Sequence, residues 1–226
     1  MKIRTLIAGN VTLALLATSS VLAADQMTKL HGKPGSKMRI EGTSTIHDWQ
    51  VESKIIGGSI EVGPNFPTDP GQDVKPGKVA AQANAYIPVR SLLSVNKDGS
   101  HYDDKMDDTM WKNLKVNDFP KIIYTTSELV LKEIPKNKEG PYVFDSKGEL
   151  AIGGVTNTIS MPVKVFPLGG KNLKITGTFP TKMSDFKIPA EKIGLGFVSF
   201  KTADDVKLLF EWMVGPPKPV AAGSNK

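Results

Sequence analysis

Cysteine is absent from the 226-residue sequence. Without thiols the chain forms no disulfides and no thiolate metal sites, and cysteine-based catalysis is excluded. A lipoprotein attachment point after the N-terminal apolar run is excluded for the same reason. We therefore expect the packing of apolar side chains to supply the stability of the fold.

Runs of like charge are also missing. The 29 Lys and Arg residues are scattered among 23 Asp and Glu residues. A nucleic-acid-binding segment would need clustered basic residues, with aromatic residues between them for stacking. We expect no nucleic-acid partner. A solvated, mildly basic surface is the favoured interpretation, and weak contact with an anionic membrane surface is the alternative.

One apolar run stands out near the N-terminus, over residues 6–16. It follows Lys2 and Arg4 and precedes small residues that end at Ala23 and Ala24. This layout is typical of a cleaved secretory signal peptide, and the run is too short for an ordinary membrane span. We expect residues 1–24 to be removed, which lowers the formal charge from +6 by 2, to +4, and leaves a periplasmic or secreted protein. An uncleaved amphipathic anchor is the alternative.

The rest of the chain has the organisation of one domain over residues 25–214. Residues 63–77, GPNFPTDPGQDVKPG, are rich in Pro, Gly and Asp and predict an extended loop between strands. Residues 215–226, GPPKPVAAGSNK, have no apolar periodicity and predict a disordered tail.

Several segments alternate apolar and polar residues with a period of two, which is typical of strands with one buried face. The pattern is clearest over residues 158–165, 173–180 and 206–214. The spacers between such segments are short, as at Gly153 and Gly154, and short spacers join antiparallel strands. The sequence therefore predicts an all-β fold in which an antiparallel sheet closes into a barrel or folds as a sandwich.

Residues 103–116, DDKMDDTMWKNLKV, break this pattern. Met106, Met110 and Leu114 fall four residues apart, which gives an apolar helical stripe. Acidic residues at the start and lysines at the end suit the helix dipole. We expect one short amphipathic helix, either as a plug that completes the core or as a lid over a cavity.

The stretch EGTSTIHDWQVES, residues 41–53, changes the parity of its apolar positions. They are even-numbered up to Ile46 and odd-numbered from Trp49. Because strand faces alternate strictly, we expect a bulge or tight corner at His47 and Asp48, with Ile46 and Trp49 both reaching the interior. A structural corner is the favoured role of His47 and Asp48. Ligand contact, and catalysis or metal binding, are the alternatives.

Catalytic and metal-binding motifs are missing too. Neighbouring residues of an extended chain point to opposite faces, so Asp48 would not orient His47 as a catalytic triad requires unless the bend re-aims it. The chain has no Gly-x-Ser-x-Gly motif, and its three histidines lack close ligand spacing. We expect no enzyme activity, metal or cofactor. A hydrolase that uses His47 and Asp48 is the enzymatic alternative.

Four sequence blocks follow one another between about residues 36 and 214. They are EGTSTIHDW, VRSLLSVNKDGSHYDDKMDDTMWKNLKVNDFPKIIYTTSEL, GELAIGGVTNTISMPVKV, and KMSDFKI with FKTADDVKLLFEW. Together these blocks resemble the YceI-like family of exported proteins, which have a lipocalin-like antiparallel β-barrel and whose characterised members bind polyisoprenoid lipids. Lys182 and Lys187 depart from the family pattern, which has arginine and glycine there, and an ammonium group lacks the bidentate geometry of a guanidinium group.

The resemblance implies a barrel with an apolar cavity for a long-chain isoprenoid, a similar lipid or a quinone-like molecule. Candidate wall residues are the inward-type residues of the alternating strands and the apolar side of the helix: Ile40, Trp49, Met110, Trp111, Tyr124, Leu150, Ile152, Met161, Val163, Ile175, Phe186, Phe210 and Trp212. The same residues would line a filled core equally well, because periodicity does not distinguish a cavity from a packed interior. The alternative function is therefore a non-enzymatic interaction or stress-related protein with a filled barrel. A homodimer is left open in both cases.

Overall fold

The computed structural model describes residues 26–190, 192–195 and 198–217. The expected signal peptide, residues 1–24, and residues 218–226 of the expected tail lie outside this range. The strands are β1 (Thr28–Gly32), β2 (Lys37–Ser44), β3 (Trp49–Ser53), β4 (Gly57–Val62), β5 (Gly77–Lys78), β6 (Ala81–Pro88), β7 (Leu93–Val95), β8 (Lys121–Glu133), β9 (Tyr142–Ile152), β10 (Val155–Pro167), β11 (Leu173–Lys182), β12 (Lys192–Leu195) and β13 (Val198–Gly215). The helices are α1 (Asp104–Asn113) and two 3₁₀ turns, η1 (Val89–Ser91) and η2 (Ser184–Phe186).

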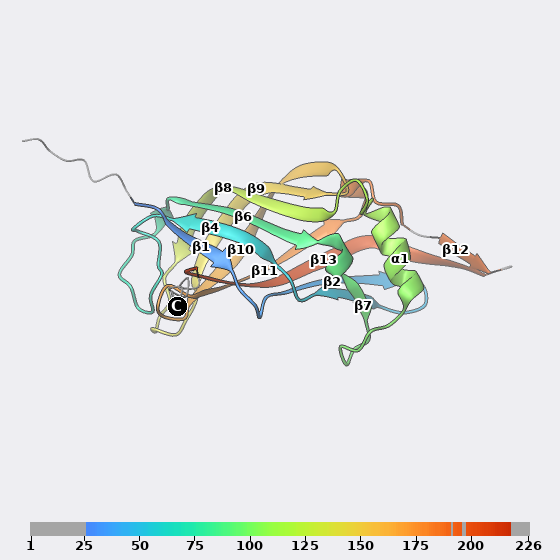
Figure 1. Cartoon of the computed structure of the whole chain (residues 1–226), viewed down its shortest axis with the longest axis horizontal. Coiled ribbons are helices and arrows are strands. Elements are labelled where there is room, and N and C mark those ends of the chain that lie inside the picture. Colours follow the sequence, from blue (N-terminus) through green and yellow to red (C-terminus); the bar gives the residue numbers. More distant parts are fainter. Residues whose placement is uncertain (1–25, 191, 196–197, 218–226) are drawn as a thin grey trace, which may run out of the picture.

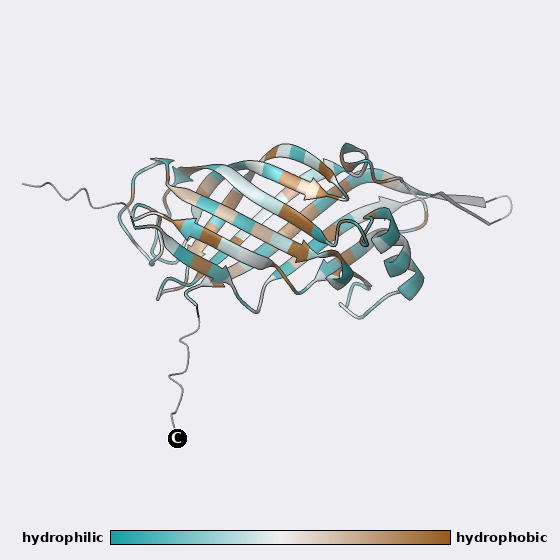
Figure 2. Ribbon diagram, turned by 45° about the horizontal axis from the view of Figure 1, so that its top comes forward, coloured by the Kyte–Doolittle hydropathy of each residue, from teal (hydrophilic) through white to brown (hydrophobic). Residues whose placement is uncertain are grey.

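The strands form a closed antiparallel barrel (Figure 1). Its order is β1-β4-β6-β8-β9-β10-β11-β13, and β13 pairs back with β1 through His31↔Gly215 and Gly32↔Val214. Strands β2, β3 and β7 continue the sheet beyond β13. Hydrophobic and hydrophilic residues alternate along the barrel strands, as Figure 2 shows. The predicted all-β barrel with one short helix is confirmed.

Two strands, β1 and β2, pair with the same edge of β13. β1 pairs with the end of β13 and β2 with its middle, and residues 33–36 form the break between them. At this break the Ser36 hydroxyl accepts a hydrogen bond from the backbone of Met213 (3.1 Å) and donates one to the carbonyl of Lys33 (2.9 Å). A side chain thus replaces the backbone partners that the break removes from the ladder.

Different segments cover the two ends of the barrel, which we call the helix end and the loop end (Figure 1). At the helix end, the Trp111 indole of α1 donates a hydrogen bond to the Leu92 carbonyl (3.0 Å). At the loop end, residues 63–76 insert Phe66, which is buried and stacks on Phe144 with ring centres 5.4 Å apart. The interior is therefore covered by apolar side chains at both ends.

Helix α1 lies where the sequence predicts it but is shorter than the predicted residues 103–116. The Asp103 carboxylate caps its start by accepting a hydrogen bond from the Met106 amide (2.9 Å). The helix ends at Asn113 because Leu114 leaves the helical conformation and Lys115 adopts a positive φ of 53°. Within the described ranges, no helix is long and apolar enough to cross a membrane.

The parity change near His47 is a hairpin turn between β2 and β3. The Ser44 hydroxyl accepts hydrogen bonds from the amides of Ile46 and His47 (3.2 Å each) and donates one to the His47 carbonyl (2.8 Å). The prediction that Ile46 reaches the interior is wrong, since its side chain is 59% exposed. The chain reverses at the barrel rim, beyond the end of the ladder, so the barrel has no interior there. Trp49 does pack against the core.

Candidate ligand-binding cavity

The barrel encloses an apolar cavity of about 110 Å³. Seven of its eight strands, with β2 and the residues Ile56 and Phe66 between strands, contribute to the wall. The polar side chains in the wall are few, namely Tyr124, Thr126, Ser146 and Trp212. An enclosed apolar space with a small number of polar groups is the usual form of a small-molecule site.

Small inward residues keep this space open. On β6, Ala81, Ala83 and Ala85 face the cavity, where larger side chains would fill it. On β11, a side chain at Gly177 would collide with the ring of Phe210. The glycine therefore lets the ring lie against the neighbouring strand, so that it lines the wall instead of crossing the lumen.

Gly148 and Tyr124 form a second pair in which a glycine lies under an aromatic ring, and this pair places a polar group in the wall. A side chain at Gly148 would collide with the ring of Tyr124. The hydroxyl groups of Tyr124 and Ser146 are hydrogen-bonded at 2.8 Å. Burial raises the pKa of the Tyr124 hydroxyl, so it stays protonated and neutral. This pair leaves the cavity uncharged.

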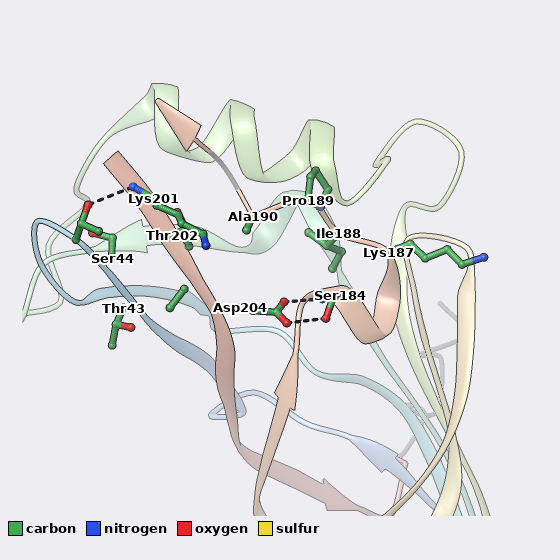
Figure 3. A pocket seen from close by; sticks show the side chains of 12 residues that line it. Thr43, Ser44, Ser184, Lys187, Ile188, Pro189, Ala190, Lys201, Thr202 and Asp204 are labelled. Carbon is green, nitrogen blue, oxygen red and sulfur yellow. Dashed lines mark hydrogen bonds between the residues drawn. The ribbon is translucent and has the colours of Figure 1, made fainter. Parts of the chain in front are cut away.

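A larger cleft of about 730 Å³ opens outside the barrel at the helix end (Figure 3). It lies between the end of β2, the segment 184–190 and the start of β13. Its rim is polar: the Ser184 hydroxyl donates a hydrogen bond to the Asp204 carboxylate (2.6 Å), and this bond is the main reason that the pKa of Asp204 is lowered. Ile188 in this cleft packs against the core. The cleft is larger but more open to solvent, so the cavity inside the barrel is the better candidate for an apolar ligand.

Seven of the thirteen candidate wall residues line the cavity: Tyr124, Leu150, Met161, Val163, Ile175, Phe210 and Trp212. The structure places the other six outside its wall. Ile40, Trp49, Met110 and Trp111 pack against the core elsewhere, and Ile152 and Phe186 are buried. Trp49 covers Gly42 near the rim, and the two α1 residues lie beyond the end of the barrel. Whether the seven lining residues touch a ligand stays a prediction.

Sequence reasoning did not name the other wall residues, although Ile159, Val165 and Leu208 lie in the clearest alternating segments. These other wall residues are Met38, Ile56, Ile60, Phe66, Ala81, Ala83, Ala85, Ile87, Ile122, Thr126, Leu129, Ser146, Ile159, Val165, Phe179 and Leu208. The stretch AQANAYI, residues 81–87, does alternate with a period of two, and its small apolar members are the signal that could have identified β6 as a cavity wall. Phe66 carries no such signal, because it lies in a loop.

His47 and Asp48 do not form the contact that a catalytic triad needs. The Nδ1 atom of His47 lies 2.8 Å from the backbone carbonyl of Asp48, not from its carboxylate. Its Nε2 atom lies 3.4 Å from the hydroxyl of Tyr102, and the ring is exposed. These contacts hold the rim of the barrel.

One group of side chains in the described ranges has donor atoms close enough together to hold a metal ion: His101, Asp104 and Asp107, within 4.8 Å of one another. Asp107 is buried, and its two oxygens already bind the Ser94 amide (2.6 Å) and His101 Nε2 (2.8 Å). The arrangement therefore anchors α1 to β7 and to the loop that precedes the helix.

The comparisons agree with this geometry. The family model described as YceI-like domain matches residues 33–213. The chain is similar in fold to BcnA of Burkholderia cenocepacia (18% identity, 79% of this chain and 95% of that chain covered, TM-score 0.55). It is also similar to a polyisoprenoid binding domain from Saccharophagus degradans (11% identity, 85% and 100% covered, TM-score 0.58). No curated protein matches the chain. Because the family match covers most of its length, the chain belongs to the YceI-like domain family.

Proposed function

We propose that this protein is an exported carrier that holds an isoprenoid chain or a similar lipid in the barrel cavity. The observation that carries the proposal is the enclosed apolar space inside a closed barrel. The shared fold with a polyisoprenoid binding domain supports the ligand class. The signal-peptide layout of residues 1–24 supports export. The contacts of His47 favour a carrier over an enzyme.

The volume of the cavity sets the length of chain that it holds. A water molecule needs about 10–15 Å³ by this measure, so the cavity of about 110 Å³ has room for roughly seven to eleven groups of that size. One to two isoprene units, with about five carbon atoms each, therefore fit. A longer chain would continue out of the cavity or displace flexible wall residues such as Met161.

The energetics favour longer chains. Burial contributes about 0.8 kcal/mol for each CH₂ group, so ten groups contribute roughly 8 kcal/mol, while association costs about 4–15 kcal/mol. Two isoprene units alone should bind weakly. We expect affinity to increase with chain length until no more of the chain can be covered by protein.

The open cleft at the helix end supplies the access route in this proposal. Leu208 lines the cavity, and Asp204, four residues earlier on β13, lines the cleft. Phe179 of β11 pairs with Leu208, and Ser184 follows shortly after the end of β11. The same two strands thus lead from the cavity to the cleft.

Organic extraction of the purified protein followed by mass spectrometry tests the function. We expect a prenyl lipid or another long apolar molecule in the extract. An empty extract, combined with failure of the protein to bind added prenyl alcohols of two to four isoprene units, would contradict the carrier and favour a filled barrel with another role. Sequencing the N-terminus of the exported protein tests the cleavage site independently.

A further inference from the structure

The indole of Trp212 is a buried donor without an acceptor. Trp212 lines the cavity and its side chain is only 4% exposed. Among buried side-chain nitrogen and oxygen atoms in the described part of the chain, its Nε1 is the one that lacks a hydrogen-bond partner. An indole N–H only donates, and a buried donor without a partner is costly, so such groups usually have one.

The other two tryptophans show the usual arrangement. Trp49 Nε1 donates to the carbonyl of Thr43 (3.2 Å), and Trp111 Nε1 donates to the carbonyl of Leu92 (3.0 Å). Within the cavity wall, the hydroxyls of Tyr124 and Ser146 satisfy each other. Trp212 therefore differs both from the tryptophans outside the cavity and from the other polar groups inside it.

Gly32 lies close to the edge of this indole. A side chain on Gly32 would begin 3.2 Å from Trp212 Nε1 and 2.9 Å from the carbonyl oxygen of Ile56. Gly32 is the last residue of β1, where the break before β2 starts. The indole edge thus lies in the cavity wall beside the break between β1 and β2, close to the backbone of Gly32 and Ile56 and not covered by a side chain at position 32.

We infer that the molecule held in the cavity carries a hydrogen-bond acceptor, such as a carbonyl or ether oxygen, that meets the indole N–H of Trp212. Trp212 is then a specificity-determining residue that favours oxygenated isoprenoids over hydrocarbons of the same shape. A site with a buried donor rejects an analogue without the matching acceptor, because the donor then stays unpaired. This inference rests on the proposed function and adds the polarity of the ligand to it.

A matched pair of probes tests the inference. Geranylacetone has two isoprene units and a ketone oxygen that only accepts hydrogen bonds, and the hydrocarbon with a methylene group in place of the carbonyl is its control. Both are titrated into the ¹⁵N-labelled protein, whose three tryptophans give three indole N–H signals. The Trp212→Phe variant identifies the signal of Trp212, and Trp111→Phe is the control for loss of an indole outside the cavity.

We expect the ketone, but not the hydrocarbon, to move the Trp212 indole proton downfield. We also expect Trp212→Phe to lower the preference for the ketone over the hydrocarbon by about fivefold, the usual worth of one hydrogen bond, while Trp111→Phe leaves it unchanged. Comparison of the ratio of Kd values between variants cancels the different solubility of the probes. If the ratio of the Kd values of the two probes is the same in Trp212→Phe and wild type, the inference is wrong. The proposed carrier function is not affected by that result. Failure of wild type to bind either probe, and also prenyl alcohols of three and four isoprene units, would overturn the proposed function itself.

Discussion

The ring of Phe210 on β13 lies over Gly177, its paired residue on β11, in the place where a side chain at position 177 would begin. The inward-facing ring of Phe210 thus lies against the barrel wall and leaves the centre of the barrel open. The openness of the cavity depends on a residue that has no side chain.

Gly177→Ala should close part of the cavity. The added methyl group displaces the Phe210 ring, and overpacking of this kind costs about 1–3 kcal/mol of the free energy of unfolding. We expect weaker binding of a prenyl probe and a lower melting temperature. Thr178→Ala, on the outer face of the same strand, is the control and should change neither quantity. Unchanged binding in Gly177→Ala would contradict the role assigned to this glycine.

Ala83→Leu should fill the cavity without overpacking it. Ala83 is buried and faces the empty space, so the larger side chain occupies room that a ligand would otherwise use. We expect binding of a prenyl probe to fall at least about tenfold, because the leucine displaces several ligand atoms. Thermal unfolding should show no loss of stability. The exposed neighbour Gln82 supplies the control variant Gln82→Ala, which should bind as wild type does.

The attachment of α1 should depend on pH through His101. Its hydrogen bond to the Asp107 carboxylate raises the pKa of His101, and Asp104 and Asp103 add to this effect. A raised pKa in the folded state means that the stabilisation is fully present below the unfolded pKa of about 6.5 and is lost as pH rises through the folded pKa.

Thermal unfolding at about pH 5.5 and about pH 8, on either side of the ordinary histidine pKa, measures this dependence. We expect His101→Gln to lose part of the extra stability that wild type has at the lower pH, relative to the higher one. His31→Gln is the control for removal of a histidine elsewhere. The same pH dependence in His101→Gln and wild type would show that the pair with Asp107 contributes nothing.

Asp107→Ala should destabilise the helix end. The variant leaves the buried amide of Ser94 without an acceptor, and a buried unsatisfied donor costs about 1–3 kcal/mol. Denaturant unfolding measures the loss. Asp108→Ala, at an exposed position of the same helix, should stay within about 0.5 kcal/mol of wild type. An equal effect of the two substitutions would contradict the anchoring role of Asp107.

Lys187→Gly should stabilise the protein. Lys187 follows η2 in the left-handed conformation, with φ 56° and ψ 29°, which costs a residue with a side chain about 1–2 kcal/mol. Part of this gain is offset by the greater freedom of glycine in the unfolded chain, so we expect a net increase of about 0.5–1 kcal/mol. Lys187→Ala keeps the strained backbone and should give no gain in the same denaturant titration.

The sequence predicts the barrel well because the period-two pattern is strong where one face of a strand is buried. The pattern also places Met161, Val163, Phe210 and Trp212 on the inner face, and the structure shows them there. The four-residue spacing predicts helix α1 but not its end, because lysine is not a residue type that favours the positive φ of Lys115.

The cavity itself could not be read from the pattern. It exists because Gly177 and Gly148 let rings lie flat and because Ala83 and Ala85 are small, and these are relationships between strands that are far apart in sequence. Phe66 contributes to the wall from a loop without periodicity. The missing partner of Trp212 Nε1 is likewise a property of the packed interior.

The pairing of β13 with β1 has a consequence for when the barrel can form. β13 is the last of the described strands, and it pairs with β11 on one edge and with β1 and β2 on the other. A nascent chain that lacks β13 cannot close the ring, and contacts between segments so far apart in sequence form slowly. The barrel is therefore completed only after the whole domain has been synthesised. Until then the chain has no closed barrel that must be unfolded, which is compatible with the proposed export in an unfolded state.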